Sequence, residues 1–366
     1  MIVAGEVSGD IHAGNLLQRL RTIRPGVEAF GVGGERLQAA DLDLVASSDD
    51  LAHMGLVEVL RELPRIRGIM GRLVQQAAAR RPRVAVLVDS PDFNLRLAAR
   101  LVPLGIPVVL YVSPQLWAWR RGRVKTVRRL AQEVLCILPF EVDFYMEYDV
   151  TARYVGHPLV DDMAADGLLD HDLPAVPGRL ALLPGSRAME IRQLLPVMLD
   201  SLRRIGDDVV EDAALIQAPG TAEVIAEVLS QCREDPRLRM VTGSDRRSEH
   251  ASCSLAWTAS GTATLECALL DVPMIVGYRL QPVSAMLARM LVRVPHVALV
   301  NLIAGERAVP ELLQNEWNPD QLVSTSRVLL ASGGAEQRPA LARVRQRLGQ
   351  PGASLRAAEA VAEYLR

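Results

Sequence analysis

Short aliphatic runs alternate with longer amphipathic stretches along the first half of this 366-residue chain. The aliphatic runs have the length of strands, and the stretches between them repeat their apolar positions every three to four residues, as helices do. We interpret as strands Ile2–Ala4, Ala29–Val32, Val84–Asp89, Pro107–Val112, Glu133–Leu138 and Ala152–Val155, and as helices Ala13–Arg24, Arg72–Arg81 and Asn94–Leu104. This alternation predicts a parallel sheet with helices on both faces.

A second series of the same kind follows residues Gly156–Pro177, a segment rich in proline and aspartate that we interpret as a linker. Its strands are Leu180–Leu183, Ala213–Ala218, Leu238–Val241, Ser254–Thr258 and Pro273–Tyr278, and its helices are Glu190–Ile205, Thr221–Gln231 and Gly261–Leu270. The pattern predicts an α/β protein with two Rossmann-like domains, residues 1–157 and 158–351. A C-terminal helix at about 352–366 could pack back on the first domain.

Composition supports a globular, cytoplasmic protein. Hydrophobic residues make up 49% of the chain and charged residues 23%, which excludes a disordered or fibrous protein. No apolar run reaches the roughly 18 residues that span a bilayer, and no secretory signal is visible. The cysteines have no metal-ligand spacing and indicate core thiols in a reducing compartment; they are Cys136, Cys232, Cys253 and Cys267. We therefore expect no metal and no cofactor.

Positive charge is concentrated in one part of the chain. The net charge is −2, yet the segment from Arg61 to Arg129 holds 15 basic and three acidic residues. A basic segment of this kind indicates an anionic partner, for which phosphate, nucleic acid and an anionic membrane all qualify. For any single arginine, a solvated helix face is the simpler explanation.

Because ligands of parallel sheets bind beyond the carboxyl ends of the strands, the loops after each strand are the candidate sites. The first such loop, Gly5–Asp10, could bind an anion or a sugar hydroxyl through Ser8 and Asp10, or these residues could simply cap the next helix. The turn Gly31–Gly34 lacks the complete dinucleotide fingerprint, so we predict no dinucleotide site there.

Two aspartates follow the most apolar strand. Either Asp89 or Asp92 could accept a proton from a hydroxyl nucleophile, whereas Asp92 and Asn94 could instead cap the following helix. In the next loop, Trp117, Trp119 and Arg120 suit stacking on a sugar or contact with a lipid interface. The alternative for the tryptophans is a packed helix start.

His157 stands at the hinge between the predicted domains. It could bind a phosphate or a sugar there, or it could hydrogen-bond the turn, and the sequence favours neither reading.

In the second domain, residues Gly185, Ser186 and Arg187 would bring main-chain donors, a helix dipole and a guanidinium together on a diphosphate. The alternative for Arg187 is a surface ion pair with Glu190. Small and hydroxyl residues open a later helix and leave room for a nucleotide: Ser260, Gly261 and Thr262.

Glu266 lies one turn into that helix and could accept the hydroxyls of a ribose, or it could be an ordinary first-turn glutamate. Asn301 adds a polar side chain in a further loop.

These motifs occur in the order of one known family. The chain closely resembles lipid-A-disaccharide synthases in the strings GEVSGD, FGVGG, HMGLVEVL, VDSPDFN, YVSPQLWAWR, LPFE, VGHPL, LLPGSRAMEI, ASGTATLE, VPMIVGYR and NLIAGE, from about Gly5 to Gln314. The resemblance implies a GT-B glycosyltransferase whose two Rossmann-like domains face each other across a cleft. It implies UDP-2,3-diacylglucosamine as donor, 2,3-diacylglucosamine 1-phosphate (lipid X) as acceptor, and the β-1,6-linked lipid A disaccharide 1-phosphate and UDP as products.

The resemblance also assigns roles. Arg187, Glu266 and Asn301 fall on UDP-binding positions, and Asp92 falls on an essential position suspected of being the base. The chain has Val7 and Ser90 where the family usually has alanine, and its first strand is shorter than usual, which leaves open whether the natural start lies upstream of Met1. Inversion at the anomeric carbon fits these residues, because a single displacement needs one base and positive groups that hold the departing diphosphate.

A lipid substrate directs attention to an amphipathic stretch. Apolar residues recur there at helical spacing, followed by arginines and further aliphatic residues; they are Met54, Leu56, Val57, Leu60, Leu63 and Ile66. We expect this stretch to touch the anionic inner face of the inner membrane peripherally and to guide acyl chains. The alternative is a helix whose apolar face packs on the sheet.

Alternative functions remain open at this stage. One is another GT-B enzyme acting on UDP-N-acetylglucosamine-type sugars, such as a 2-epimerase or the peptidoglycan transferase, and another is a non-catalytic UDP-sugar sensor. We expect no nucleic-acid partner, and a homodimer is left open.

Overall fold

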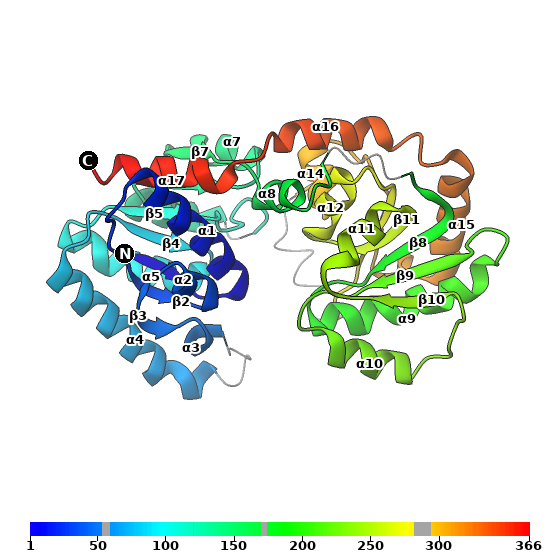
Figure 1. Cartoon of the computed structure of the whole chain (residues 1–366), viewed down its shortest axis with the longest axis horizontal. Coiled ribbons are helices and arrows are strands. Elements are labelled where there is room, and N and C mark those ends of the chain that lie inside the picture. Colours follow the sequence, from blue (N-terminus) through cyan, green and yellow to red (C-terminus); the bar gives the residue numbers. More distant parts are fainter. Residues whose placement is uncertain (53–58, 120, 170–173, 282–293) are drawn as a thin grey trace. The chain divides into compact units, whose positions relative to one another are not determined.

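The computed structural model describes residues 1–52, 59–119, 121–169, 174–281 and 294–366. Contacts divide the chain into two compact units (Figure 1). Unit 1 comprises Met1–Asp161 and Gln350–Arg366, and unit 2 comprises Asp162–Gly349. Helix α8 (Pro158–Ala165) contains this division and lies within the segment that we interpreted as a linker.

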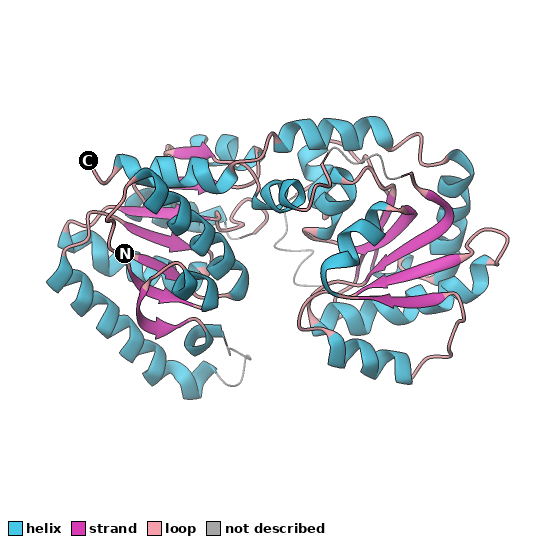
Figure 2. Ribbon diagram, in the orientation of Figure 1, coloured by secondary structure: helices cyan, strands magenta, loops and turns pink. Residues whose placement is uncertain are grey.

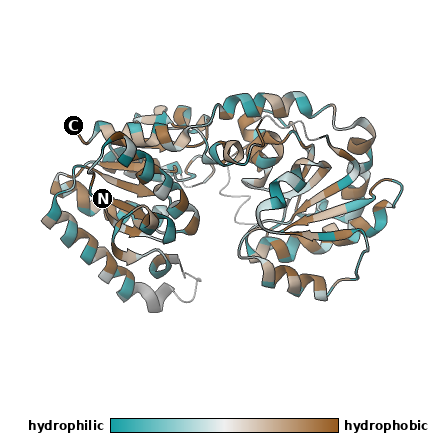
Figure 3. Cartoon of the chain, in the orientation of Figure 1, coloured by the Kyte–Doolittle hydropathy of each residue, from teal (hydrophilic) through white to brown (hydrophobic). Residues whose placement is uncertain are grey.

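Unit 1 is built on a seven-stranded parallel sheet in the order β3-β2-β1-β4-β5-β6-β7. Its strands are β1 (Ile2–Ala4), β2 (Phe30–Gly33), β3 (Asp43–Ser47), β4 (Ala85–Val88), β5 (Val108–Tyr111), β6 (Glu133–Cys136) and β7 (Ala152–Tyr154). The central strands are buried along their whole length, as expected for strands covered on both faces, which is why their sequences are continuously apolar (Figure 3).

Helices cover both faces of this sheet (Figure 2). They are α1 (Val7–Ile23), α2 (Glu35–Ala39), α3 (Asp49–Ala52), α4 (Val59–Arg80), α5 (Pro91–Leu101), α6 (Val124–Leu130), α7 (Phe140–Met146) and the C-terminal α17 (Ala353–Glu363). Leu16, Leu17 and Leu20 on α1 share one core with Ala357 and Val361 on α17, so the end of the chain completes the unit in which the chain begins.

Unit 2 holds a six-stranded parallel sheet in the order β10-β9-β8-β11-β12-β13. Its strands are β8 (Val176–Leu183), β9 (Asp212–Ile216), β10 (Leu238–Val241), β11 (Cys253–Ala259), β12 (Met274–Tyr278) and β13 (Glu311–Leu313). The helices are α9 (Ala188–Ile205), α10 (Ala222–Ser230), α11 (Arg246–Ala251), α12 (Ala263–Leu269), α14 (Leu299–Ala304), α15 (Pro319–Ser332) and α16 (Arg338–Leu348). A separate apolar core, which includes Trp257 and Trp317, fills this unit.

The predicted class, two Rossmann-like parallel-sheet domains, is confirmed, and several elements differ from the prediction. Strands β3 and β13 were missed because they are short and contain charged residues. Helix α5 begins at Pro91 rather than at Asn94, since proline suits the first helical position, where no N–H is needed. Helix α8 was not predicted at all.

Candidate functional site

Backbone strain marks the carboxyl ends of β4 and β5 in unit 1. Asp89 and Ser90 have φ of 50° and 40°, and Val112 has φ of 61°. The two strands are neighbours, and N–H of Asp89 donates to the carbonyl of Tyr111 at 3.1 Å. Non-glycine residues adopt this conformation at a cost of about 1–3 kcal/mol each, and such residues gather at functional sites. These two turns are therefore the strongest candidate site of unit 1.

Asp92 is the accessible carboxylate at this edge. It is the second residue of α5, its side chain is 65% exposed, and it forms an ion pair of 2.6 Å with Arg123. Asp89 is half-buried in the turn itself. The amide of Asn94 is buried and donates to the carbonyls of Val88 and Asp89 at 3.1 and 2.8 Å, so Asn94 holds the turn. Neither Asp92 nor Asn94 is the N-cap, which is Ser90.

The carboxylate of Asp10 is occupied by hydrogen bonds within unit 1. Its buried carboxylate accepts hydrogen bonds from N–H of Gly34, Arg36 and Leu37 at 2.6, 2.9 and 3.2 Å. It thereby caps α2 and fixes the second glycine-rich turn. Ser8, on the first turn of α1, is exposed.

The two tryptophans of the loop after β5 have different surroundings. Trp117 is buried, and its Nε1 donates to Glu141 at 3.0 Å, so its ring offers no stacking face at the surface of unit 1. The packed alternative holds for this residue. Trp119, by contrast, is 42% exposed. Arg120 lies outside the described residues.

His157 is also engaged by its own turn. The ring is buried, and its Nδ1 accepts a hydrogen bond from N–H of Leu159 at 3.1 Å. Burial lowers the pKa of His157 to about 3, so the ring is neutral at pH 7. Of the two readings open from the sequence, this geometry supports the turn.

In unit 2, the loops after β8 and β11 lie side by side. The strands pair through Leu183 and Thr258, and a Cβ on Gly185 would lie 3.3 Å from the Cβ of Ala259 and 2.6 Å from Oε2 of Glu190. Gly185 has φ of 108°, so a side chain at this position is excluded by both space and conformation.

Arg187 stands at the N-cap of α9, next to exposed Ser186. Its guanidinium is 83% exposed and forms an ion pair of 3.2 Å with Glu190, which was the alternative that the sequence left open. An exposed ion pair of this kind contributes about 0–1 kcal/mol, so an incoming anion can readily replace Glu190.

The loop after β11 combines a fixed and an open part. Oγ of Ser260 donates to the carbonyl of Val297 at 2.9 Å, whereas a Cβ on Gly261 would meet nothing within 4 Å and Thr262 is exposed. Glu266 on α12 is 20% exposed, and its Oε1 lies 3.9 Å from Nε of Arg247. Burial raises the pKa of Glu266, and the positive charge of Arg247 opposes this shift.

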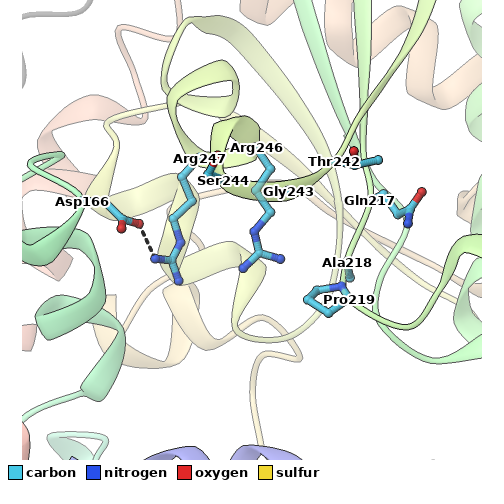
Figure 4. Close-up of a pocket in the computed structure, with 9 residues that line it drawn as sticks. All are labelled: Asp166, Gln217, Ala218, Pro219, Thr242, Gly243, Ser244, Arg246 and Arg247. Carbon is cyan, nitrogen blue, oxygen red and sulfur yellow. Dashed lines mark hydrogen bonds and ion pairs between the residues drawn. The ribbon is translucent and has the colours of Figure 1, made fainter.

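A cavity of about 490 Å³ opens at the carboxyl ends of β9 and β10, within unit 2 (Figure 4). The guanidinium groups of Arg246 and Arg247 extend side by side from α11 toward it, opposite Gln217 and Thr242. Nη1 of Arg247 binds Asp166 at 2.5 Å. The cavity has the size of a small-molecule site, and Arg247 joins it to Glu266.

Asn301, which we expected in a loop, lies on the short helix α14, and its amide is enclosed by the segment that follows this helix. It is buried, its Nδ2 donates to the carbonyl of Val309 and to Oε1 of Glu311 at 3.0 and 2.8 Å, and its Oδ1 accepts from N–H of Val309 at 2.9 Å. Its amide therefore organises residues 301–311, and it presents no polar atom to solvent.

Comparison with known proteins identifies the family. A family profile described as lipid-A-disaccharide synthetase matches residues 1–364. The chain belongs to this family. It is similar to the lipid-A-disaccharide synthase of Anaeromyxobacter sp. (strain K), with 45% identity over 100% of this chain and 97% of that protein. The lipid-A-disaccharide synthase of Myxococcus xanthus (strain DK1622) is 43% identical over the same shares.

Solved structures share the fold at lower identity. A UDP-N-acetylglucosamine 2-epimerase described from Listeria monocytogenes matches with a TM-score of 0.64 at 14% identity, covering 100% of this chain and 95% of that one. The glycotransferase of kitacinnamycin matches with a TM-score of 0.66 at 15% identity, covering 99% and 97%. Members of the lipid-A-disaccharide synthetase family thus share the GT-B fold with other glycosyltransferases and with epimerases.

Several residues that border the candidate site of this family member were not among the candidates chosen from the sequence. Arg123, Glu141, Arg246, Arg247 and Tyr278 all border the loops described above. Arg246 and Arg247 begin the helix that follows the short loop after β10, so a search of the loops after each strand could have found them. The partners of Arg123 and Glu141 are 31 and 24 residues away, which no local pattern reveals.

The predicted membrane segment is covered only in part. Met54, Leu56 and Val57 lie outside the described residues, as do the side chains of Leu60 and Leu63. Farther along α4, Ile66 is half-buried and Ile69, Met70 and Leu73 are buried, whereas Arg65, Arg67 and Arg72 are exposed. The described part of α4 therefore packs its apolar face inward and presents arginine outward.

Within the described ranges, no helix combines the length and apolar character needed to cross a bilayer. The same part of the chain holds no group of three or more His, Cys, Asp or Glu side chains placed to bind a metal ion.

Proposed function

We propose that this chain catalyses the reaction of its family, the transfer of a diacylglucosaminyl group from UDP-2,3-diacylglucosamine to 2,3-diacylglucosamine 1-phosphate. The observation that carries the proposal is the family match over residues 1–364. The product is the β-1,6-linked lipid A disaccharide 1-phosphate, and UDP is released. An epimerase would act without a lipid acceptor, and a sensor would release no UDP.

The chemistry needs one displacement at the anomeric carbon of the donor. The 6-hydroxyl oxygen of the acceptor forms the new bond to this carbon while the bond to the UDP oxygen breaks, so the configuration inverts. The hydroxyl proton passes to Asp92, whose carboxylate is exposed at the start of α5 and held by Arg123. Trp119 and Ser8, exposed at the same edge of the unit 1 sheet, are proposed to contact the acceptor.

Unit 2 is proposed to hold UDP. Arg187 and the N–H groups at the start of α9 receive the diphosphate, whose charge grows as the bond to the sugar breaks. Glu266 accepts the ribose hydroxyls, and the nucleoside occupies the cavity beside Arg246 and Arg247. Asn301 is proposed to affect UDP binding only indirectly, by holding the segment 301–311 in place.

The base is tested by Asp92→Asn. We expect turnover to fall roughly 10²–10⁴-fold, because the amide cannot take the proton. UDP release is measured after donor and acceptor are mixed, with folding checked by circular dichroism. Asp89→Asn is the comparison, and Asp143→Asn, an exposed change on α7, is the matched control. Full activity of Asp92→Asn together with an inactive Asp89→Asn would move the role to Asp89.

The donor site is tested by calorimetry with UDP. Arg187→Ala and Glu266→Gln should each weaken UDP binding by about 1.5–3 kcal/mol, since each loses a hydrogen bond to a charged group. Arg192→Ala, which removes another exposed arginine of α9, should bind UDP as the parent does. If both site variants bind UDP normally, the nucleotide lies elsewhere.

The membrane is proposed as a peripheral partner on the cytoplasmic side. The exposed arginines of α4 support this, since each cation near an anionic surface adds about 1 kcal/mol. Changing Leu56, Val57 and Leu60 together to serine should abolish co-sedimentation with anionic vesicles and leave the melting temperature unchanged. A large fall in melting temperature with binding retained would instead identify a core helix. The sequence left a homodimer open, and light scattering would test for it.

A further inference from the structure

A buried carboxylate joins two loops at the carboxyl edge of the unit 1 sheet. Glu141, the second residue of α7, is 1% exposed. Its Oε1 accepts from Nε1 of Trp117 at 3.0 Å, and its Oε2 accepts from N–H of Leu138 at 3.1 Å. The second contact is an ordinary helix-start contact, whereas the first ties α7 to the loop that follows β5.

Further contacts hold the same loop against α7. The indole of Trp117 packs edge-on against Phe140, with ring centroids 4.9 Å apart. The hydroxyl of Tyr145 donates to the carbonyl of Pro114 at 3.2 Å and lies 3.0 Å from Oγ of Ser113. These contacts stand directly after Val112, whose strained φ of 61° needs such support from its surroundings.

The loop held in this way contributes to the proposed site. It carries the exposed Trp119, and it leads to the turn Arg121–Arg123, from which Arg123 reaches Asp92 at 2.6 Å. A change in the conformation of this loop is therefore expected to affect Arg123 and its ion pair with the candidate base. Glu141 itself is too deeply buried to touch a substrate.

We propose that Glu141 is a positioning residue for the transfer reaction, which holds the loop 112–119 through Trp117 in the conformation that presents Trp119 and Arg123. This inference rests on the proposed function, because the loop matters for turnover only if unit 1 receives the acceptor. Glu141 would act through Trp117 and not by contact with the reacting atoms.

The charge of Glu141 gives a second, independent readout. Burial raises its pKa to about 7, against the opposing hydrogen bonds from Leu138, Trp117, Ser113 and Ile137. The titratable groups around it are Tyr145 on α7, Cys136 on β6 and Tyr154 on β7, whose pKa values are all raised by burial, and Arg356 acts on Tyr154. Glu141 is thus the member of this cluster that changes charge near pH 7.

Two variants test the proposal. Glu141→Gln places an amide NH₂ against one of two N–H donors, and Trp117→Phe keeps the ring contact but removes the donor to Glu141. We expect each to lower kcat/KM for the lipid acceptor at least tenfold, while the Kd for UDP stays within twofold of the parent. The double variant should be no less active than the less active of the two single variants, because both changes break the same contact. Glu147→Gln, an exposed change just beyond the end of α7, is the control with parental kinetics.

A fluorescence titration separates failure of this proposal from failure of the proposed function. In a Trp119→Phe background, Trp117 is the only tryptophan of unit 1, and its emission should titrate with a midpoint near pH 7. The titration should vanish in Glu141→Gln. A parent without transfer activity would overturn the proposed function, whereas the titration would still report the contact. If Glu141→Gln fails to fold, the kinetics of Trp117→Phe alone test the positioning role. A folded Trp117→Phe variant with parental kinetics would overturn that role.

Discussion

Single residues with unusual backbone conformations define the edge of the unit 1 sheet. Val112 is the clearest case, because a β-branched residue with φ of 61° is a genuine outlier. Asp89 and Ser90 adopt similar conformations one strand away. All three are held by neighbours, which indicates that the fold maintains these turns at an energetic cost for a purpose other than stability.

The strain at Val112 can be measured by substitution with glycine. Val112→Gly removes a half-buried side chain but relieves the strained φ, so we expect the free energy of unfolding to change by no more than about 1 kcal/mol. Val109→Gly, in the buried regular part of β5, should lose roughly 3 kcal/mol or more. Urea unfolding of both variants provides the comparison, and equal losses would mean that Val112 is not strained.

At the scale of elements, the last helix is attached by one carboxylate. Asp161 on α8 accepts hydrogen bonds from N–H of Gly352, Ala353 and Ser354 at 2.6, 3.0 and 3.0 Å. These are the otherwise unpaired donors at the start of α17. The guanidinium of Arg356 adds a hydrogen bond to the carbonyl of Val155 at 2.8 Å. Helix α17 therefore docks on α1 through apolar contacts and on the first turn of α8 through its cap.

Loss of this cap should loosen α17 before the rest of unit 1. Asp161→Ala is expected to lower the free energy of unfolding by about 1–2 kcal/mol, and amide exchange along Ala353–Glu363 should speed up more than exchange in β4 and β5. Glu359→Ala, an exposed change on α17 itself, is the matched control. Unchanged exchange in Asp161→Ala would show that apolar packing alone holds the helix.

At the scale of the whole molecule, each unit has its own core and its own buried titrating groups. Glu141 lies in unit 1, and burial raises its pKa to about 7. His250 lies in unit 2, in contact with Cys267, and burial lowers its pKa to about 4. The two groups therefore make the stability of the two units depend on pH in opposite directions.

The signs follow from proton linkage. Glu141 contributes stability that is fully present below its ordinary pKa of 4.5 and is lost as pH rises through about 7. His250 contributes stability that is present above 6.5 and is lost as pH falls through about 4. Each effect amounts to roughly 3 kcal/mol at 1.36 kcal/mol per pKa unit.

Calorimetric scans at pH 5 and pH 7.5 test these signs. In the parent, we expect unit 1 to be less stable at pH 7.5 than at pH 5, and Glu141→Gln should remove this difference. We expect unit 2 to be less stable at pH 5 than at pH 7.5, and His250→Gln should remove that difference. Glu147→Gln should leave both transitions as in the parent. Equal pH dependence in the parent and Glu141→Gln would show that Glu141 is already charged at pH 5.

The sequence by itself determined the alternation of strands and helices, the two sheets and the loops in which polar side chains gather. It could do so because periodicity is a local property, and because parallel strands bring all their carboxyl ends to one edge. The short strands β3 and β13 were not predicted, because a strand of few residues that includes a charged side chain forms only through pairing with its neighbour.

Only the tertiary structure decided which of those polar side chains remain available. Asp10, Asn94, Trp117, His157 and Asn301 were all candidates for binding a substrate, and each is buried with at least one polar atom hydrogen-bonded inside the protein. Some of their partners are close in sequence and others are not: Asp10 binds N–H groups that begin 24 residues away. Most buried polar groups are paired, and which partner each one finds depends on how the chain packs. Packing likewise decides that Asp92, Arg187 and Trp119 are exposed and that Glu266 is partly exposed.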